Sequence, residues 1–598
     1  MDKELRICQN CKQQFTIELE DFKFYGKMQV PPPTFCPECR LVRRLAWINE
    51  RTLYPRQVNG KNTISMYSPD KPFTIMEDKE WWSDTWNPLE YGVDYDFSTA
   101  FFQQFHELML RVPLPHLQRD YATMVNSDYC NAAAGLKNCY LVVGADQSED
   151  CSYCFSVENL KDCVDMLLSL RSELCYEGSG LKNCFKCIFS EDCEGSQELL
   201  FCRDCIGCTA CLGSINLRNK SYYIFNKPHT KEGYYKTLES FRLGSMKAFE
   251  QKRKESEQFF LQHPRNFMHA RKNEKVSGDY IYESKNVTDS FVVGRGENCR
   301  YAQHLKYVST GTKDAYDYTQ FGVGAELLYE AAWCGLGVSN VKFSLWNYGS
   351  QNLEYSFACH SSKNLFGCIG VRRGNFCILN KQYAKEEYEA LLPKIIQHMK
   401  EMPYIDKKGR VYRYGEFFPA ELSPFGYNET LAQYFFTLSQ EEAQEKGYEW
   451  QRAGERNIQL TISTQNLPDD IAAVNEDITK GVIECAHQGP PAGGCNEQCT
   501  TGFRIIPQEF QFYKKMNLPL PRLCPNCRNY QRIARRNPLK LWQRKCQCAG
   551  MTSDNGIYKN TIEHFHKQNH CPNEFETSYS LQRPEIVYCE KCYLAEVA

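Results

Sequence analysis

The sequence predicts a mainly β protein: two tandem β-solenoid-like repeat arrays with capping helices, flanked by two metal-binding modules. Three observations support this prediction. Cysteine pairs with the spacing of zinc ligands occur near both ends of the chain, short cysteine-containing units repeat in its middle, and one motif ends each of the two arrays. At 598 residues the chain is too long for a single hydrophobic core, so several domains are expected.

The cysteine pattern of the first module returns near the end of the chain. Each copy has two close cysteines, 24 further residues, and then a CxxC pair, and the copies align without a gap from Phe15 and Phe503 onward. The second pair leads into a basic helix, as in a treble-clef zinc finger. The predicted ligands of two structural zinc ions are Cys8, Cys11, Cys36 and Cys39, and Cys495, Cys499, Cys524 and Cys527. Four thiolates leave no coordination position open, so we do not expect catalysis at these metals.

The first module is expected to span residues 1–95, including a Trp-rich extension at 81–92. A helical connector follows at 96–127, with a helix at 97–112 that ends before two prolines.

The first array is expected to span 128–228. Its units combine a polar residue, a cysteine and often an aromatic, and marked cysteines recur every 9 or 12 residues at Cys139, Cys151, Cys163, Cys175, Cys184, Cys193 and Cys205. Because two units make 21 to 24 residues, that length is predicted for one coil of a stacked β-solenoid. One capping helix, running to about residue 262, is predicted within 229–275.

The second array is expected to span 276–382. It has the same texture with few cysteines, since Leu, Val and Phe often fill the cysteine position. A metal ligand cannot be replaced by leucine, so many of these cysteines are predicted to pack in the interior. The motif from Ile224 to Tyr234 ends the first array and returns from Ile378 to Tyr388, before a second capping helix at 383–402. Residues 403–483 form a connector without an assignment.

The C-terminal module, residues 484–598, is expected to hold a further zinc ion, which makes about three per chain. Cys589-x2-Cys592 needs partners among Cys546, Cys548 and Cys571. We predict the set Cys548, Cys571, Cys589 and Cys592, with Cys546 as the alternative and His564, His566 and His570 in reserve. In the first module Val58 takes the place of Cys546 and Glu77 that of Cys589, so its second site is expected to be degenerate.

The stretch from Lys514 to Lys545 has ten basic residues and no acidic one. A positively charged helix with nearby aromatic residues suits phosphate and base contacts in RNA or DNA. The predicted contact residues are Arg528, Arg532, Arg535, Arg536, Lys540, Arg544 and Lys545. The alternative is that the helix pairs with acidic surface in the same protein, because residues 128–211 carry 14 acidic and 6 basic side chains.

The run Cys202, Cys205, Cys208 and Cys211 has the C-x2-C spacing of iron–sulfur proteins but lacks the usual Cys-Pro. Buried thiols, a further zinc and a cluster all remain open for it. No P-loop, GxSxG or HExxH motif occurs. The competing class is a redox or carbohydrate-active enzyme built on the arrays, with Asp314, Asp317 and Glu326 as the carboxylates to test.

Four segments, CPECRLVRRLAWINERTLYPR, ISMYSPDKP, WWSD and CPNEFETSYSLQRPEIVYCEKCY, resemble an uncharacterised family of large bacterial treble-clef zinc-finger proteins with Cys-rich repeats. The resemblance covers essentially the whole chain, and it implies structural zinc without naming a function. Some similar chains carry a family III CoA-transferase label, which the cysteine-spaced units do not support.

Together these patterns predict a zinc-binding, non-enzymatic interaction scaffold. Its C-terminal finger is expected to contact nucleic acid and its arrays to contact protein, and a protein-binding role alone remains if the basic helix is neutralised internally. The chain lacks an N-terminal hydrophobic leader and a run of 18 apolar residues, and 32 cysteines with CxxC pairs suggest metal ligands. We therefore expect a cytoplasmic protein without membrane contact.

Overall fold

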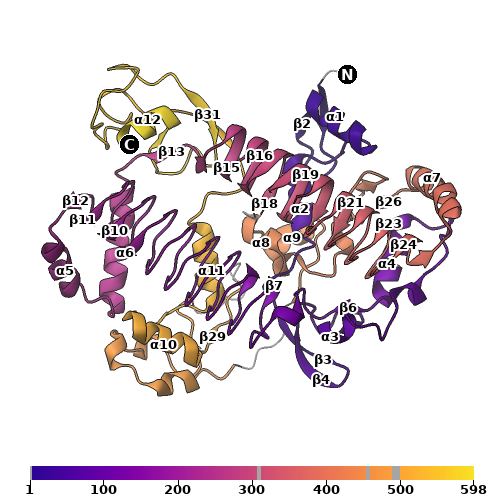
Figure 1. Ribbon diagram of the computed structural model, residues 1–598, viewed down its shortest axis with the longest axis horizontal. Coiled ribbons are helices and arrows are strands. Elements are labelled where there is room, and N and C mark those ends of the chain that lie inside the picture. Colours follow the sequence, from indigo (N-terminus) through magenta and orange to yellow (C-terminus); the bar gives the residue numbers. More distant parts are fainter. Residues whose placement is uncertain (1–2, 306–310, 323, 453–457, 488–497, 598) are drawn as a thin grey trace. The chain divides into compact units, whose positions relative to one another are not determined.

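The computed structural model describes residues 3–305, 311–322, 324–452, 458–487 and 498–597 (Figure 1). It is mostly sheet with a few helices, as the sequence predicts, and it divides into two compact units. Unit 1 comprises Met1–Leu117, Met268–Gln451 and Leu539–Leu541, and unit 2 comprises Gln118–Phe267, Arg452–Pro538 and Trp542–Ala598. Each unit therefore combines one terminal module with the array that is more distant from it in the sequence.

The first array, in unit 2, is a parallel ladder that advances by 12 residues. Lys137 pairs with Glu149, Glu149 with Lys161, and Lys161 with Glu173. The predicted coil of 21 to 24 residues is therefore wrong: four three-residue units, and not eight, separate a residue from its partner in the next turn. The strands in this region are β7 (Asn131–Ala134), β8 (Val143–Asp146), β9 (Gln197–Leu200), β10 (Thr209–Leu212), β11 (Ser221–Ile224) and β12 (Lys227–Pro228).

A three-residue backbone period explains the cysteine content of this array. The middle residue of a unit has positive φ, for example 54° at Asp150, and the next residue, Cys151, is fully buried. Left-handed backbone is unfavourable for residues other than glycine, but here the Asp150 N–H donates to the Lys137 carbonyl of the preceding turn at 3.0 Å. The interior of such a narrow turn is filled largely by small side chains, chiefly cysteine and serine. Their thiols and hydroxyls bond to backbone carbonyls: Cys139 Sγ lies 3.4 Å from the Ser148 carbonyl oxygen.

The second array, in unit 1, is a 12-stranded sheet whose pairs are parallel except for the last. Its register also advances by 12 residues at Gln351, Lys363 and Asn375. The strands are β14 (Ala270–Arg271), β15 (Glu274–Tyr282), β16 (Lys285–Gly294), β17 (Gly296–Arg300), β18 (Gln303–Leu305), β19 (Thr312–Phe321), β20 (Glu326–Ala332), β21 (Ser339–Leu345), β22 (Gln351–Glu354), β23 (Lys363–Phe366), β24 (Asn375–Ile378) and β25 (Lys381–Gln382).

Helices follow both arrays, as the repeated end motif predicts. After the second array α7 (Lys385–Glu401) packs on β24. After the first array the prediction of a single helix is wrong, because α5 (Lys231–Ser240) and α6 (Met246–Phe260) are separate. The second of these begins anew at Ser245, whose hydroxyl accepts a hydrogen bond from the Ala248 N–H.

The two terminal modules share their elements. Helix α1 (Leu19–Met28) corresponds to α10 (Pro507–Met516), and α2 (Pro37–Leu45) to α11 (Pro525–Ala534), in the register of the gapless alignment. The remaining strands of the modules are β1 (Glu4–Ile7), β2 (Gln14–Ile17), β3 (Tyr54–Val58), β4 (Lys61–Ser65), β28 (Ile483–Glu484), β29 (Gly502–Phe503), β30 (Trp542–Lys545), β31 (Glu574–Thr577) and β32 (Val587–Tyr588). The last helix of the described residues is α12 (Glu590–Val597).

The rest of unit 1 joins its module to its array. The helix predicted at 97–112 is α4 (Phe101–Arg111), and the first part of the unassigned connector, up to Gln451, belongs to this unit. The short elements here are β5 (Ile75–Met76), α3 (Asp78–Trp81), β6 (Leu114–Pro115), β26 (Tyr404–Ile405), β27 (Val411–Tyr412), α8 (Leu431–Phe435) and α9 (Gln440–Glu445). The later part of the connector belongs to unit 2. Outside the connector, unit 2 also contains β13 (Arg265–Asn266), which pairs with β32.

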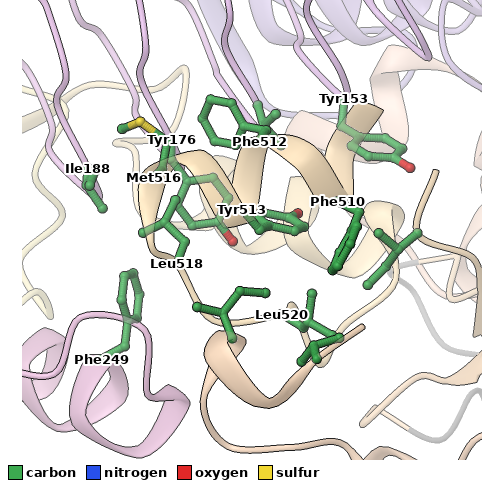
Figure 2. Packing of buried hydrophobic residues seen from close by; sticks show 14 of the residues in the cluster. Tyr153, Tyr176, Ile188, Phe249, Phe510, Phe512, Tyr513, Met516, Leu518 and Leu520 are labelled. Atoms are coloured by element: carbon green, nitrogen blue, oxygen red, sulfur yellow. The ribbon is translucent and has the colours of Figure 1, made fainter. Parts of the chain in front are cut away.

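In unit 2 the module and the array share one apolar core. Figure 2 shows Phe510, Phe512, Tyr513 and Met516 of α10 in a buried cluster with Tyr153, Tyr176 and Ile188 of the array. The rings of Tyr176 and Tyr513 meet edge to face, with centroids 5.7 Å apart. The helix α10 of the C-terminal module therefore packs against this face of the array. Within the described part of the chain, no helix has the length and apolar character needed to cross a membrane.

Candidate metal centres

The N-terminal module brings its four predicted ligands together. The sulfur atoms of Cys8, Cys11, Cys36 and Cys39 all lie within 4.8 Å of one another. Cys8 follows β1, whereas Cys36 and Cys39 lie at the N-terminus of α2, and the Cys36 N–H donates to Cys8 Sγ at 3.2 Å. Hydrogen bonds from the Cys36 and Cys39 thiols lower the pKa of Cys8.

The second group contains a cysteine that sequence reasoning missed. Cys485, Cys499, Cys524 and Cys527 have their sulfur atoms within 4.8 Å of one another, and Cys495 lies outside the described residues. The Cys524 N–H donates to Cys485 Sγ at 3.2 Å, just as Cys36 does to Cys8. Hydrogen bonds from the neighbouring thiols, that of Cys485 first, lower the pKa of Cys524.

The strands around Cys485 repeat the arrangement around Cys8. Cys485 directly follows β28, which pairs with β29 as β1 pairs with β2 in the first module. The first two ligands are therefore 14 positions apart here and three apart in the first module. Spacing alone favoured Cys495 because it lies close to Cys499 in sequence; Cys495 is outside the described residues, and Cys485 belongs to the group found among the described ones.

The third group combines Cys546, Cys571, Cys589 and Cys592. It contains the alternative ligand Cys546 in place of the predicted Cys548. Cys546 directly follows β30, and its sulfur accepts from the Cys589 N–H at 3.2 Å, which is the same contact as in the other two groups. Hydrogen bonds, that from Cys546 first, lower the pKa of Cys589. All three groups thus join the end of a strand to a CxxC pair at the start of a helix.

Cys548 belongs to a fourth group, with His564, His566 and Cys592. His570, the other reserve candidate, is exposed, and its Nδ1 lies 3.2 Å from the carbonyl oxygen of Cys571. In the first module Val58 is buried and Glu77 lies 3.9 Å from Lys61.

The run Cys202, Cys205, Cys208 and Cys211 occupies inward positions of successive three-residue units, and all four are buried. These residues are not among the groups of the described chain that could hold a metal ion. Cys202 Sγ instead lies 3.4 Å from the Leu200 carbonyl oxygen and 3.3 Å from that of Cys211. In the second array burial raises the pKa of Cys299 to about 12 and that of Cys334 to about 11, which keeps these thiols protonated. The geometry therefore favours packing for these cysteines.

The arginines of α11 pair with carboxylates of the first array. Asp165 lies between two of them, 3.2 Å from Arg528 Nε and 2.8 Å from Arg532 Nη2, and Arg532 Nη1 is 2.8 Å from Glu177. Arg528 and Arg532 are buried, at 4% and 0% exposure. These two predicted nucleic-acid contacts thus have partners within the protein. Because their guanidinium groups are buried, a phosphate backbone cannot reach them.

The other predicted contact residues also have neighbours. Arg535 lies 2.7 Å from Glu191, and Arg536 lies 4.0 Å from Asp192. Arg544 donates to the Ser580 carbonyl at 3.2 Å. Lys545 pairs with Glu574 at 3.2 Å on an exposed surface, and Lys540, within unit 1, pairs with Glu38 at 3.0 Å.

Unit 1 repeats the buried ion-pair network. Asp317 lies 2.9 Å from Arg40 Nη2 and 3.1 Å from Arg44 Nη1, and Arg44 is also 3.0 Å from Glu330. The sequence alignment pairs Arg40 with Arg528 and Arg44 with Arg532. Helices α2 and α11 therefore each bring two arginines, four residues apart, to a buried aspartate and a second carboxylate of an array.

Asp317, one of the carboxylates considered for catalysis, belongs to this ion-pair network. It is fully buried. Asp314 accepts a hydrogen bond from Asn298, whereas Glu326 is exposed. The aromatic residues of this array pack in the protein: Trp346 is buried, and Tyr316 stacks on Phe24 with ring centroids 3.8 Å apart.

Comparisons with known proteins add no family. The chain matches no known protein-family model and none of the curated proteins with which its sequence was compared.

Proposed function

We propose that this protein is a zinc-stabilised, non-enzymatic interaction scaffold, in which treble-clef modules fasten two β-solenoids. The observation that carries the proposal is the common geometry of the three four-cysteine groups. Each joins a strand end to a helix start through one N–H···S contact of 3.2 Å. Tetrahedral sulfur sites of this kind are typical of structural zinc.

The contacts of the modules support a mechanical role for the metal. In both units the helix that begins at the metal group also carries the arginines of the buried ion-pair network. A metal ion at the helix start would fix the direction of the helix and thereby the position of its arginines. The arrays, with their repeated 12-residue register, would then offer regular surfaces to a protein partner.

Metal analysis of the purified full chain tests the identity of the ion. We expect stoichiometric zinc, with at least three ions per chain, and a colourless protein, because zinc has a filled d shell. Inductively coupled plasma mass spectrometry gives the stoichiometry, and an absorption spectrum detects iron–sulfur charge transfer. Stoichiometric iron with visible absorption would overturn the assignment to zinc.

The charge pairing of α11 favours protein as the partner over RNA or DNA. We expect no salt-sensitive binding of mixed RNA and DNA, because Arg528 and Arg532 are buried and the array beside them is acidic. Fluorescence anisotropy across a salt series is the measurement, since phosphate contacts lose affinity steeply as salt rises. Tight binding at low salt that Lys545→Ala weakens, with zinc content unchanged, would restore the nucleic-acid function through the exposed surface.

A further inference from the structure

We propose that the C-terminal module holds two zinc ions joined by the Cys592 thiolate. One ion would be bound by Cys546, Cys571, Cys589 and Cys592, and the other by Cys548, His564, His566 and the same Cys592. The inference rests on the proposed structural role of zinc and extends it to a binuclear centre.

The positions of the ligand atoms carry the first step. Each of the two groups has its four ligand atoms within 4.8 Å of one another, and Cys592 Sγ belongs to both. Zn–S bonds of about 2.3 Å and Zn–N bonds of about 2.1 Å at tetrahedral angles place ligand atoms roughly 3.4–3.8 Å apart. In the structure His566 Nε2 lies 3.3 Å from Cys592 Sγ, and Cys548 Sγ lies 3.0 Å from His564 Nδ1. Small movements would bring these atoms to coordination distances.

The second step comes from the groups behind the two histidines. His564 Nε2 lies 2.8 Å from Glu596 Oε1, and both side chains are fully buried. His566 Nδ1 lies 2.6 Å from the carbonyl oxygen of Asn569. Both partners are hydrogen-bond acceptors, so the N–H of each imidazole points to them and its lone pair points to the cysteine sulfurs. Metal-binding histidines are held by carboxylates and carbonyls in this way.

Glu596 is itself held in place by hydrogen bonds, so the carboxylate behind His564 has a fixed position. Its carboxylate accepts hydrogen bonds from Tyr558 at 2.8 Å and from the Thr561 N–H at 3.0 Å. Glu596 lies on α12, the same helix as Cys592, so one helix positions the bridging ligand and the carboxylate behind His564. Asn560 donates to Cys548 Sγ at 3.2 Å and supports the remaining ligand.

A shared thiolate explains how both ions reach four ligands. Seven residues supply eight coordination positions only if one of them is used twice, and Cys592 is the residue common to both groups. Five thiolates and two neutral imidazoles around two divalent ions leave one net negative charge. Without the bridge the second ion would keep three protein ligands and a water molecule, which is the arrangement of an open zinc site.

The test compares metal content among full-length variants. We expect four zinc ions per chain in the unmodified protein and three in His566→Ala, with unchanged helix content by circular dichroism. His570→Ala is the matched control, because His570 lies outside both groups, and it should keep four. Equal zinc content in the unmodified protein and His566→Ala would overturn the second ion, while loss of one ion in Cys39→Ser would still support the proposed scaffold.

Cadmium-113 substitution tests the bridge itself. In the unmodified chain, two cadmium resonances should each be split by coupling through the shared sulfur, and His566→Ala should leave a single unsplit resonance in their place. Two unsplit resonances from the C-terminal module would show two separate ions, with water completing the second site, and would overturn the binuclear proposal.

Discussion

Replacement of Arg532 by alanine is expected to lower the free energy of unfolding of unit 2 by about 3–5 kcal/mol. The guanidinium group lies 2.8 Å from both Asp165 and Glu177 and is fully buried, so its removal takes from each carboxylate one of its two arginines. Arg44→Ala should have a similar effect in unit 1, where Asp317 and Glu330 would each lose one of their arginine partners. Hydrogen exchange under increasing urea is the measurement, because it reports each unit separately in a protein of this size.

Lys545→Ala provides the matched control. It also removes a positive charge from an ion pair, but Lys545 and Glu574 have side chains that are 78% and 62% exposed. Exposed pairs contribute about 0–1 kcal/mol, so this variant should differ little from the unmodified protein. Equal effects of Arg532→Ala and Lys545→Ala would contradict a structural role for the buried network.

Replacement of Cys485 by serine should remove the zinc ion bound at the start of α11 and unfold that helix. Structural zinc contributes about 10–16 kcal/mol to the folding of isolated zinc-finger peptides, so loss of one ligand should be severe. The amides of residues 525–534 should then exchange at nearly unprotected rates. Zinc analysis together with hydrogen exchange of this helix checks the prediction.

Two cysteine variants accompany this experiment. Cys163→Ser should keep all zinc, because Cys163 is an inward array residue and serine already fills the same kind of position at Ser148 and Ser172. Cys495→Ser tests the ligand that spacing predicted. If Cys495→Ser loses one zinc ion and Cys485→Ser loses none, the geometry of the second group is contradicted.

Features determined by neighbouring residues could be predicted from the sequence. The CxxC pairs and the helices that follow them are local, so the four ligands of the first group and the register of the two modules came directly from spacing. Cys485 was not found because the segment after it is longer than its counterpart after Cys8. Cys548 was favoured over Cys546 because spacing does not show where β30 ends.

Long-range pairing was beyond the sequence. The basic stretch around Arg532 and the acidic array were both visible, but only the fold shows that Asp165 lies between Arg528 and Arg532. The 12-residue register was present in the intervals between cysteines. The left-handed residue in every three-residue unit is not visible in the sequence, so an interval of 12 residues was interpreted as half of a coil and not as a complete turn. No local pattern shows which array each terminal module joins.

The pairing of each module with its distant array has a consequence during translation. Arg44 leaves the ribosome 273 residues before Asp317, which is roughly 14–55 s at bacterial and eukaryotic elongation rates. Throughout that interval the nascent N-terminal segment carries cationic groups whose eventual counter-ions do not yet exist. In unit 2 the order is reversed, because the buried carboxylate Asp165 is synthesised before its partner Arg532. Neither half can complete its charged interior while the polypeptide is still short, so maturation is coupled to late stages of synthesis.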